Sequence, residues 1–170
     1  MTATPRQCEV GVQLRDRTLN VTAARLRRAA QAAARYSVRK PARLSVVVVD
    51  DKTMRSLNLA YARVLGTTDV LAFDLSGGPK APARRAVGRS GRQSGESVDG
   101  EVIVNAAVAA AEARKMRRNP EDELLLYVVH GVLHLGGYRD HTPAEKRAMR
   151  AAEAGVIASL ARAAGKGRSR

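Results

Sequence analysis

The sequence predicts an α/β (α+β) fold, a single domain over residues 1–164 with a small mixed β-sheet packed against helices. Three observations predict it. Strand-like and helix-like segments alternate along the 170 residues. Apolar residues make up 45% of the chain, which suffices for one sizeable core. Finally, Leu124–Leu135 is long and apolar enough to be a buried helix lying against the sheet.

The first half of the chain is predicted to run strand, helix, strand, helix. Glu9–Leu14 alternates apolar with other residues, as a half-buried strand does. The alanine- and arginine-rich Thr22–Tyr36 is predicted to be a helix with its first threonine as N-cap. Arg43–Val49 holds four consecutive valines, whose branched β-carbons favour a central strand. In Lys52–Leu65 the apolar residues recur at helical spacing.

The second half is predicted to add two short strands and three helices. The expected strands are Asp69–Leu75 and Glu101–Val104. Between them, Ser76–Asp99 is rich in Gly, Ser, Pro and Arg and almost without apolar residues, so we expect a mobile basic loop. The remaining segments are three helices, at about Ala106–Arg117, Glu121–Leu135 and Pro143–Ala163, and a basic tail at Gly165–Arg170.

The charge of the chain predicts a polyanionic partner. Thirty Lys and Arg against sixteen Asp and Glu leave a net charge of +14, which favours nucleic acid. A membrane is disfavoured, because no apolar run approaches the roughly 18 residues of a spanning helix and Met1–Asn20 lacks a signal-peptide core. The alternative is a solvated basic face in a chain whose arginine and alanine content is inflated by its coding background. We expect a soluble, cytoplasmic protein, and the single cysteine, Cys8, agrees with a reducing compartment.

The apolar run carries a candidate metal site. His130 and His134 are four residues apart, so on a helix both imidazoles lie on one face and can turn a nitrogen toward one ion. A Gly-Gly stop follows, and then Asp140 and His141 offer a carboxylate and a third imidazole. The alternative is a pair of satisfied core histidines. The conjunction of spacing, stop and third donor is instead typical of a zinc site with three protein ligands and an open fourth position.

The residue after the first histidine disfavours one class of zinc enzyme. Peptidases of the His-Glu-x-x-His type need a glutamate there as general base, and this chain has Gly131. The helix is therefore zincin-like without the peptidase base. Aromatic residues are only 3% of the chain, which also disfavours an RNA-binding sheet built on stacked bases.

The residues of this motif resemble those of a known family, the bacterial YbeY endoribonucleases or rRNA maturation factors. Residues 130–138 (HGVLHLGGY) match the first nine positions of its His-Gly-x-Leu-His-Leu-x-Gly-Tyr-Asp-His signature. Residues 57–61 (LNLAY), 68–73 (TDVLAF) and 100–104 (GEVIV) look like three further segments of the family. The resemblance runs from about Val46 to Glu153.

The chain departs from the family pattern at two places that matter for the site. The last two signature positions are Asp-His, but here Arg139 intrudes, so that Asp140 and His141 each stand one place late. Either Asp140 is the third ligand in the ungapped register, which we favour slightly, or the turn bulges and brings in His141. The family arginine after the tyrosine is Ala62 here, and Arg63 lies about 100° further round a helix, which puts an equivalent role in doubt.

The resemblance implies a zinc-dependent endoribonuclease specific for single strands, active in 16S rRNA 3′-end maturation and ribosome quality control. One zinc ion would be held by His130, His134 and either Asp140 or His141. Whichever of the last two does not bind the ion would orient the attacking water or act as general acid, and Arg63 would stabilise charge on the phosphate. The expected partners are ribosomal RNA and the ribosome, with no small-molecule substrate. The alternative is a non-catalytic RNA-associated protein whose metal is structural and closed by four protein ligands.

Overall fold

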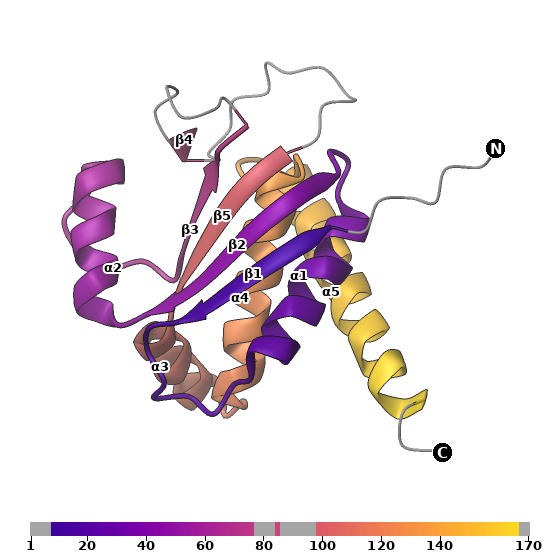
Figure 1. Cartoon of the computed structure of the whole chain (residues 1–170), viewed down its shortest axis with the longest axis horizontal. Coiled ribbons are helices and arrows are strands. Elements are labelled where there is room, and N and C mark those ends of the chain that lie inside the picture. Colours follow the sequence, from indigo (N-terminus) through magenta and orange to yellow (C-terminus); the bar gives the residue numbers. More distant parts are fainter. Residues whose placement is uncertain (1–7, 77–83, 86–97, 167–170) are drawn as a thin grey trace.

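A five-stranded sheet in the order β1-β2-β5-β3-β4 forms the centre of the computed structural model, which describes residues 8–76, 84–85 and 98–166 (Figure 1). Strands β1, β2 and β5 are parallel, whereas β3 is antiparallel to β5 and β4 to β3, so the sheet is mixed as predicted. The strands are β1 (Glu9–Leu14), β2 (Pro41–Val49), β3 (Val70–Asp74), β4 (Arg84–Arg85) and β5 (Val98–Asn105).

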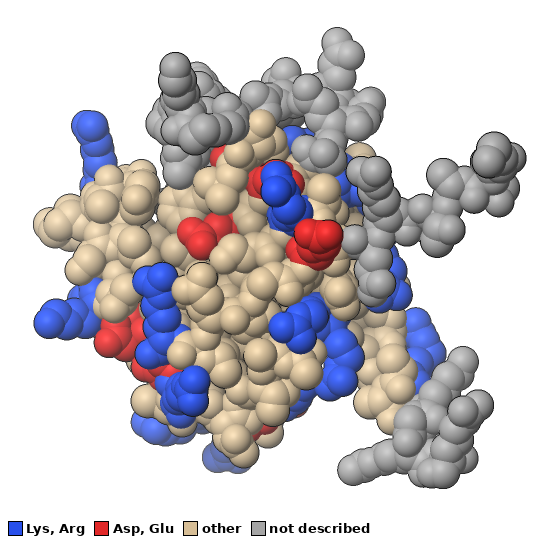
Figure 2. All heavy atoms as spheres, viewed as in Figure 1, with Lys and Arg blue, Asp and Glu red and all other residues tan. Residues whose placement is uncertain are grey.

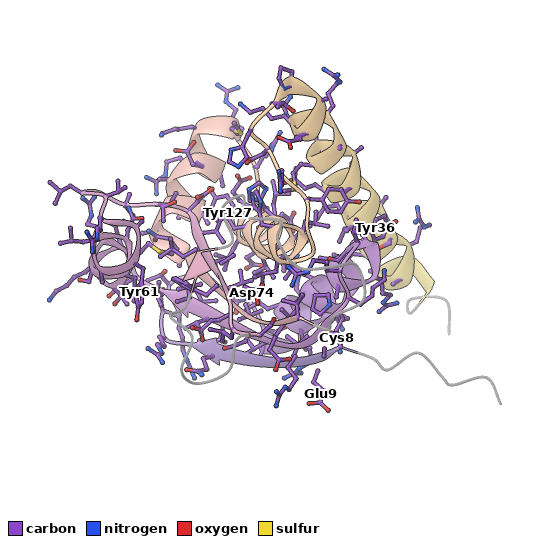
Figure 3. The ribbon with its side chains drawn as sticks, turned by 90° about the horizontal axis from the view of Figure 1, so that it is seen from above. Cys8, Glu9, Tyr36, Tyr61, Asp74 and Tyr127 are labelled. Atoms are coloured by element: carbon purple, nitrogen blue, oxygen red, sulfur yellow. The ribbon has the colours of Figure 1, made fainter. Side chains whose placement is uncertain are left out.

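Helices cover the two faces of the sheet unequally. The large core lies between one face and α1, α3, α4 and α5, and Figure 3 shows these helices gathered on that side. A small core of six buried residues lies on the other face, partly covered by α2. No helix among the described residues is long and apolar enough to cross a membrane. The helical elements are α1 (Ala23–Tyr36), α2 (Asp51–Leu57), the π-helical turn η1 (Asn58–Ala62), α3 (Ala106–Met116), α4 (Pro120–Leu135) and α5 (Pro143–Lys166).

The valine run of β2 is central because it is buried on both faces. Val46 and Val48 pack into the large core, and Val47 and Val49 into the small one. Such a strand reads as a continuous apolar run rather than an alternation. The predicted N-cap of α1 is also confirmed, since the Thr22 side chain accepts the backbone N–H of Arg25 at 3.2 Å.

The helix predicted over Lys52–Leu65 is shorter than expected. It changes to a π-helical turn at Asn58 and ends at Arg63, whose φ of 55° is left-handed. The buried side chain of Asn58 donates to the carbonyl of Gly66 at 3.2 Å, which folds the chain back and prevents another α-helical turn. The apolar residues that gave the helical spacing beyond this point are therefore at the surface.

The ends of two predicted segments also differ. β5 begins at Val98, before the predicted start at Glu101, because Val98 is fully buried and Gly100 lets the Leu135 side chain approach the strand. Helix α5 continues beyond Ala163 to Lys166 and so takes the first two residues of the predicted tail. Of the predicted loop 76–99, residues 77–83 and 86–97 lie outside the described residues, as do 167–170 of the tail.

A fully buried asparagine fixes the loop that leads into β3. The side-chain Oδ1 of Asn105 accepts two backbone N–H groups in the first turn of α3. Its side-chain Nδ2 donates to Asp51 at 3.0 Å, to Thr67 Oγ1 at 2.9 Å and to the Thr68 carbonyl at 3.2 Å. The hydrogen bond from Thr67, with those from Arg55 and Asn105, lowers the pKa of Asp51 to about 2. This network holds residues 67–69 beside α4.

Candidate metal centre

Helix α4 is well delimited at both ends. Asn119 caps it by accepting the amides of its first turn, and three acidic residues follow there, where the helix dipole favours negative charge. At the other end the Tyr138 amide donates to the Leu133 carbonyl at 3.0 Å, and Gly137 has a φ of 101° that other residues rarely adopt. A Cβ on Gly136 would lie 2.2 Å from that of Ser37, so the turn packs directly on the end of α1.

Gly131 faces the sheet. A Cβ built on it would lie 2.6 Å from Cγ1 of Val102 and 3.0 Å from Cγ2 of Val70. No glutamate fits at this position unless α4 moves away from β5 and β3. The glycine that disfavours a peptidase in the sequence is thus a close-packing residue of the core.

His130 and His134 point their Nε2 atoms at one another, 2.9 Å apart. Each Nδ1 is engaged elsewhere: that of His130 with the Glu153 carboxylate at 2.7 Å, and that of His134 with the Tyr138 carbonyl at 3.1 Å. A carboxylate and a carbonyl only accept, so both Nδ1 atoms carry the protons and both Nε2 atoms are acceptors in the neutral rings. Two acceptors that face each other this closely need a cation between them, either a shared proton or a metal ion.

Asp140 supplies a third donor next to this pair. Its Oδ2 lies 3.8 Å from Nε2 of His134 and 4.0 Å from Nε2 of His130, so one atom from each of the three residues lies within 4.8 Å of the others. Among the described residues this is the one group of three or more such side chains. The donors suit zinc, which takes imidazole nitrogen and carboxylate oxygen.

His141 is exposed and does not belong to that group. Its backbone N–H donates to Glu145 at 3.1 Å, at the start of α5. Its ring is nevertheless close enough for its charge to contribute to lowering the pKa of His134. The geometry therefore supports Asp140 as the ligand and leaves His141 at the margin of the site, and the choice between them stays a prediction.

The two histidines differ electrostatically. Burial disfavours the charged form of His130, but the hydrogen bond and charge of Glu153, helped by the charges of Asp69 and Asp140, outweigh it and raise its pKa. For His134, burial and the neighbouring His130 lower the pKa. One ring is thus polarised by a carboxylate behind it, and the other stays neutral more readily.

Sequence reasoning missed Glu153 and Asp69. Glu153 lies on α5, 23 residues after His130, among the buried Met149, Ala152 and Val156. A carboxylate on the apolar face of a predicted helix was the one signal for it. Asp69 precedes β3, where the Asn105 network holds its loop, and no spacing in the sequence links it to the histidines.

The structure does not bring Arg63 to this cluster. Its side chain is exposed, and within the described parts of the chain no hydrogen bond or ion pair joins it to the histidines or Asp140. Its backbone N–H donates to the Leu59 carbonyl at 3.2 Å, which closes the π-helical turn. A catalytic role for Arg63 stays a prediction.

Comparison with known proteins places this chain in a family. The family model described as Endoribonuclease YbeY matches residues 11–161. The chain belongs to the YbeY family. Among curated YbeY endoribonucleases, that of Salinibacter ruber is 43% identical over 110 residues, or 65% of this chain and 65% of that protein. That of Anaeromyxobacter dehalogenans is 37% identical over 143 residues, or 84% of this chain and 65% of that protein.

The match to these YbeY relatives covers somewhat less than two thirds of their own length. The fold is shared with the solution structure of TM1509 from Thermotoga maritima, with a TM-score of 0.54, 17% sequence identity, and coverage of 89% of this chain and 91% of that one. At that identity the likeness establishes the fold alone, and it agrees with the predicted α+β class.

The Glu153 contact leads to a testable expectation for this YbeY-family site. Glu153→Ala is expected to weaken zinc binding by about 10–100-fold, the usual cost of removing a group that orients a ligating histidine. Glu153→Gln, which keeps the shape but loses the charge, should fall between this variant and the native chain. A zinc-competition titration measures both affinities. Glu112→Gln, which removes a carboxylate paired with Lys115, is the control. Unchanged zinc affinity in Glu153→Ala would contradict the assignment.

Proposed function

We propose that this YbeY-family chain is a zinc-dependent endoribonuclease that cleaves single-stranded RNA during ribosomal RNA maturation. The observation that carries the proposal is the pair of facing Nε2 atoms with Asp140 beside them, both Nδ1 atoms being engaged elsewhere. The names of the relatives, each an endoribonuclease, support the reaction class. The net charge of +14 supports a polyanionic substrate.

In this proposal His130, His134 and Asp140 hold one zinc ion. When bound, the ion supplies Lewis-acid chemistry, polarising a phosphoryl oxygen and acidifying a water molecule. Glu153 and the Tyr138 carbonyl keep the two rings in the tautomer and orientation that present Nε2. The buried body of α4, packed through Gly131 on the sheet, holds the donors in place before substrate arrives.

Proton transfer and neutralisation of phosphate charge are assigned to two exposed residues outside the ligand group. His141, which is exposed and adjacent in sequence to the proposed ligand Asp140, is proposed to protonate the leaving oxygen or to orient the attacking water. Arg63 is proposed to neutralise phosphate charge on bound RNA, at a distance from the ligands. Within the described residues no hydrogen bond or ion pair joins the side chain of His141 or Arg63 to the proposed ligands.

The second candidate is a basic RNA-associated protein whose metal is structural. Structural zinc sites are closed by four protein ligands. The group found in the described residues has three, which favours an open position and therefore an enzyme. A role at the ribosome, 16S rRNA 3′-end maturation, ribosome quality control and a cytoplasmic location are further parts of the proposal, resting on the family.

Variants of Asp140 and His141 test the site and the function together. Asp140→Ala is expected to lower zinc affinity by more than about 100-fold, whereas His141→Ala should lower it less, since only Asp140 reaches both Nε2 atoms. At saturating zinc, His141→Ala should still reduce kcat on a single-stranded RNA by about 100-fold or more if it transfers a proton. Zinc-competition titrations and initial rates on single-stranded and duplex RNA measure these effects.

Two outcomes would contradict parts of this scheme. A larger loss of zinc affinity in His141→Ala than in Asp140→Ala would show that the turn rearranges to make His141 the ligand. Zinc-loaded native protein that cuts neither single-stranded nor duplex RNA would reject the endoribonuclease and favour the structural metal.

A further inference from the structure

The segment from Leu59 to Leu65 carries an exposed apolar patch that the metal centre does not explain. Leu59 is 51% exposed, Tyr61 54%, Val64 49% and Leu65 85%. Nine large hydrophobic side chains are exposed among the described residues, and four of them fall in these seven positions. Scattered exposed apolar residues are ordinary, but such a concentration marks an interaction site. We call these four residues the 59–65 patch.

The backbone presents the patch at a conformational cost. The segment leaves the α-helix as a π-helical turn and ends on a left-handed Arg63, a conformation that costs a side-chain-bearing residue free energy. The hydrogen bond between buried Asn58 and Gly66 holds it there. A continued α-helix would have avoided both features, and π-helical turns are frequent at functional sites.

Tyr61 is held rather than free within the patch. Its ring meets Phe73 of the small core edge to face, with centroids 5.1 Å apart and planes at 66°. More than half of the side chain stays accessible, and Figure 3 shows Tyr61 beside α2, on the opposite side of the molecule from α5. It is the most exposed of the five aromatic side chains of the chain, so a planar group can lie against a ring that is already oriented.

The charges around the patch select its partner. Lys52, Arg55 and Arg63 are exposed on α2 and the patch segment. Two carboxylates accompany them: Asp50 accepts the backbone N–H of Thr53, and Asp51 pairs with Arg55 and accepts from Asn105. In Figure 2 the region of α2 shows mostly uncharged atoms, with Lys and Arg at several points of its border and Asp or Glu at its lower end. A second copy of this +14 chain would bring like charges together. An aromatic ring among cations instead fits single-stranded nucleic acid, whose bases stack and whose phosphates pair with Lys and Arg.

The chain that follows the patch leads into β3, which packs against the histidine-bearing helix α4. Asn105 fixes Thr67 and Thr68 on the way, and Cγ2 of Val70 lies 3.0 Å from the position of a Cβ built on Gly131, the neighbour of His130. We propose that the 59–65 patch binds an unpaired base of the RNA strand, with Tyr61 stacked on it and Leu65 covering its edge. This inference rests on the proposed function and adds to it a site that prefers unpaired over paired RNA.

Substitutions at Tyr61 separate stacking from folding. Tyr61→Leu keeps an apolar contact for Phe73 but removes the ring face, and Tyr61→Phe keeps both. The zinc-loaded full chain is titrated into a labelled, hydrolysis-resistant phosphorothioate single strand of about 12 nucleotides, followed by fluorescence anisotropy. Tyr61→Leu is expected to weaken binding about tenfold, the size of one lost base stack, and Tyr61→Phe less than about twofold. The slope of affinity against salt should stay the same, because no phosphate contact is lost.

Leu65→Ser tests the patch without touching the core. At 85% exposure it should leave thermal stability unchanged and weaken RNA binding about threefold, whereas Met116→Ser, 56% exposed at the end of α3, should change neither. Native affinity in both Tyr61→Leu and Leu65→Ser, with cleavage intact, would overturn this inference and leave the proposed function standing. So would self-association of the native chain that Leu65→Ser abolishes while RNA affinity is kept. Failure of the native chain to bind any RNA would reject the proposed function itself.

Discussion

Alanine at His130 or His134 is expected to abolish stoichiometric zinc binding and, with it, RNA cleavage. Each ring supplies one of two facing Nε2 atoms, so losing either leaves one imidazole and one carboxylate, too few for a zinc site. The loss should exceed the roughly 10–100-fold that follows from removing a group behind a ligand, such as Glu153. Zinc content after apo-exchange, measured by atomic emission, and initial rates on single-stranded RNA report it.

The fold should survive these substitutions, because both rings are partly exposed and neither belongs to the large core. Leu126→Ala, one turn earlier on the same half-buried stripe of α4, is the matched control and should keep its zinc. Full zinc occupancy in either histidine variant would show that these two histidines do not form the metal site.

Glutamate at Gly131 is expected to unfold the protein rather than make it a peptidase. The Cβ alone would overlap Val102 at 2.6 Å, and the carboxylate would be buried between α4 and the sheet without a partner. Even Gly131→Ala should lower the free energy of unfolding by about 1–3 kcal/mol. It should do so although alanine in a helix interior is otherwise favoured over glycine by about 1 kcal/mol.

Urea denaturation followed by circular dichroism measures the free energy of unfolding of the Gly131 variants. Ala111→Glu, on the exposed face of α3, is the control for the added charge. A Gly131→Ala variant more stable than the native chain would mean that α4 does not lie as close to β5 as the structure places it.

The regular parts of the fold could be predicted from the sequence because the residue patterns that indicate them are local. The alternation of β1, the valine run of β2, the N-cap of α1 and the apolar length of α4 each depend on neighbours a few residues apart. The spacing of His130 and His134 is of the same kind, since a helix fixes the relation between positions four apart. The missing glutamate after His130, which disfavours a zinc peptidase, is likewise read from a single position.

The wrong predictions of element boundaries have a common origin in contacts between distant segments. Apolar spacing over Lys52–Leu65 suggested one helix, but the bond from Asn58 to Gly66 ended it and left Val64 and Leu65 at the surface. The start of β5 was placed too late because Asp99 and Gly100 do not look like strand residues, and their pairing with β2 and β3 makes them so.

By itself the sequence thus determined the fold class and the helix with its two histidines, and it left a choice between Asp140 and His141 just beyond it. Only the tertiary structure decided that Asp140 lies near both Nε2 atoms, that Glu153 backs His130, and that Tyr61 stands exposed. The physical reason is the sequence separation of the interacting residues. Helical spacing is set by backbone geometry within one turn, whereas these three relations arise only when distant segments, among them α4, α5 and the loop before β3, pack together.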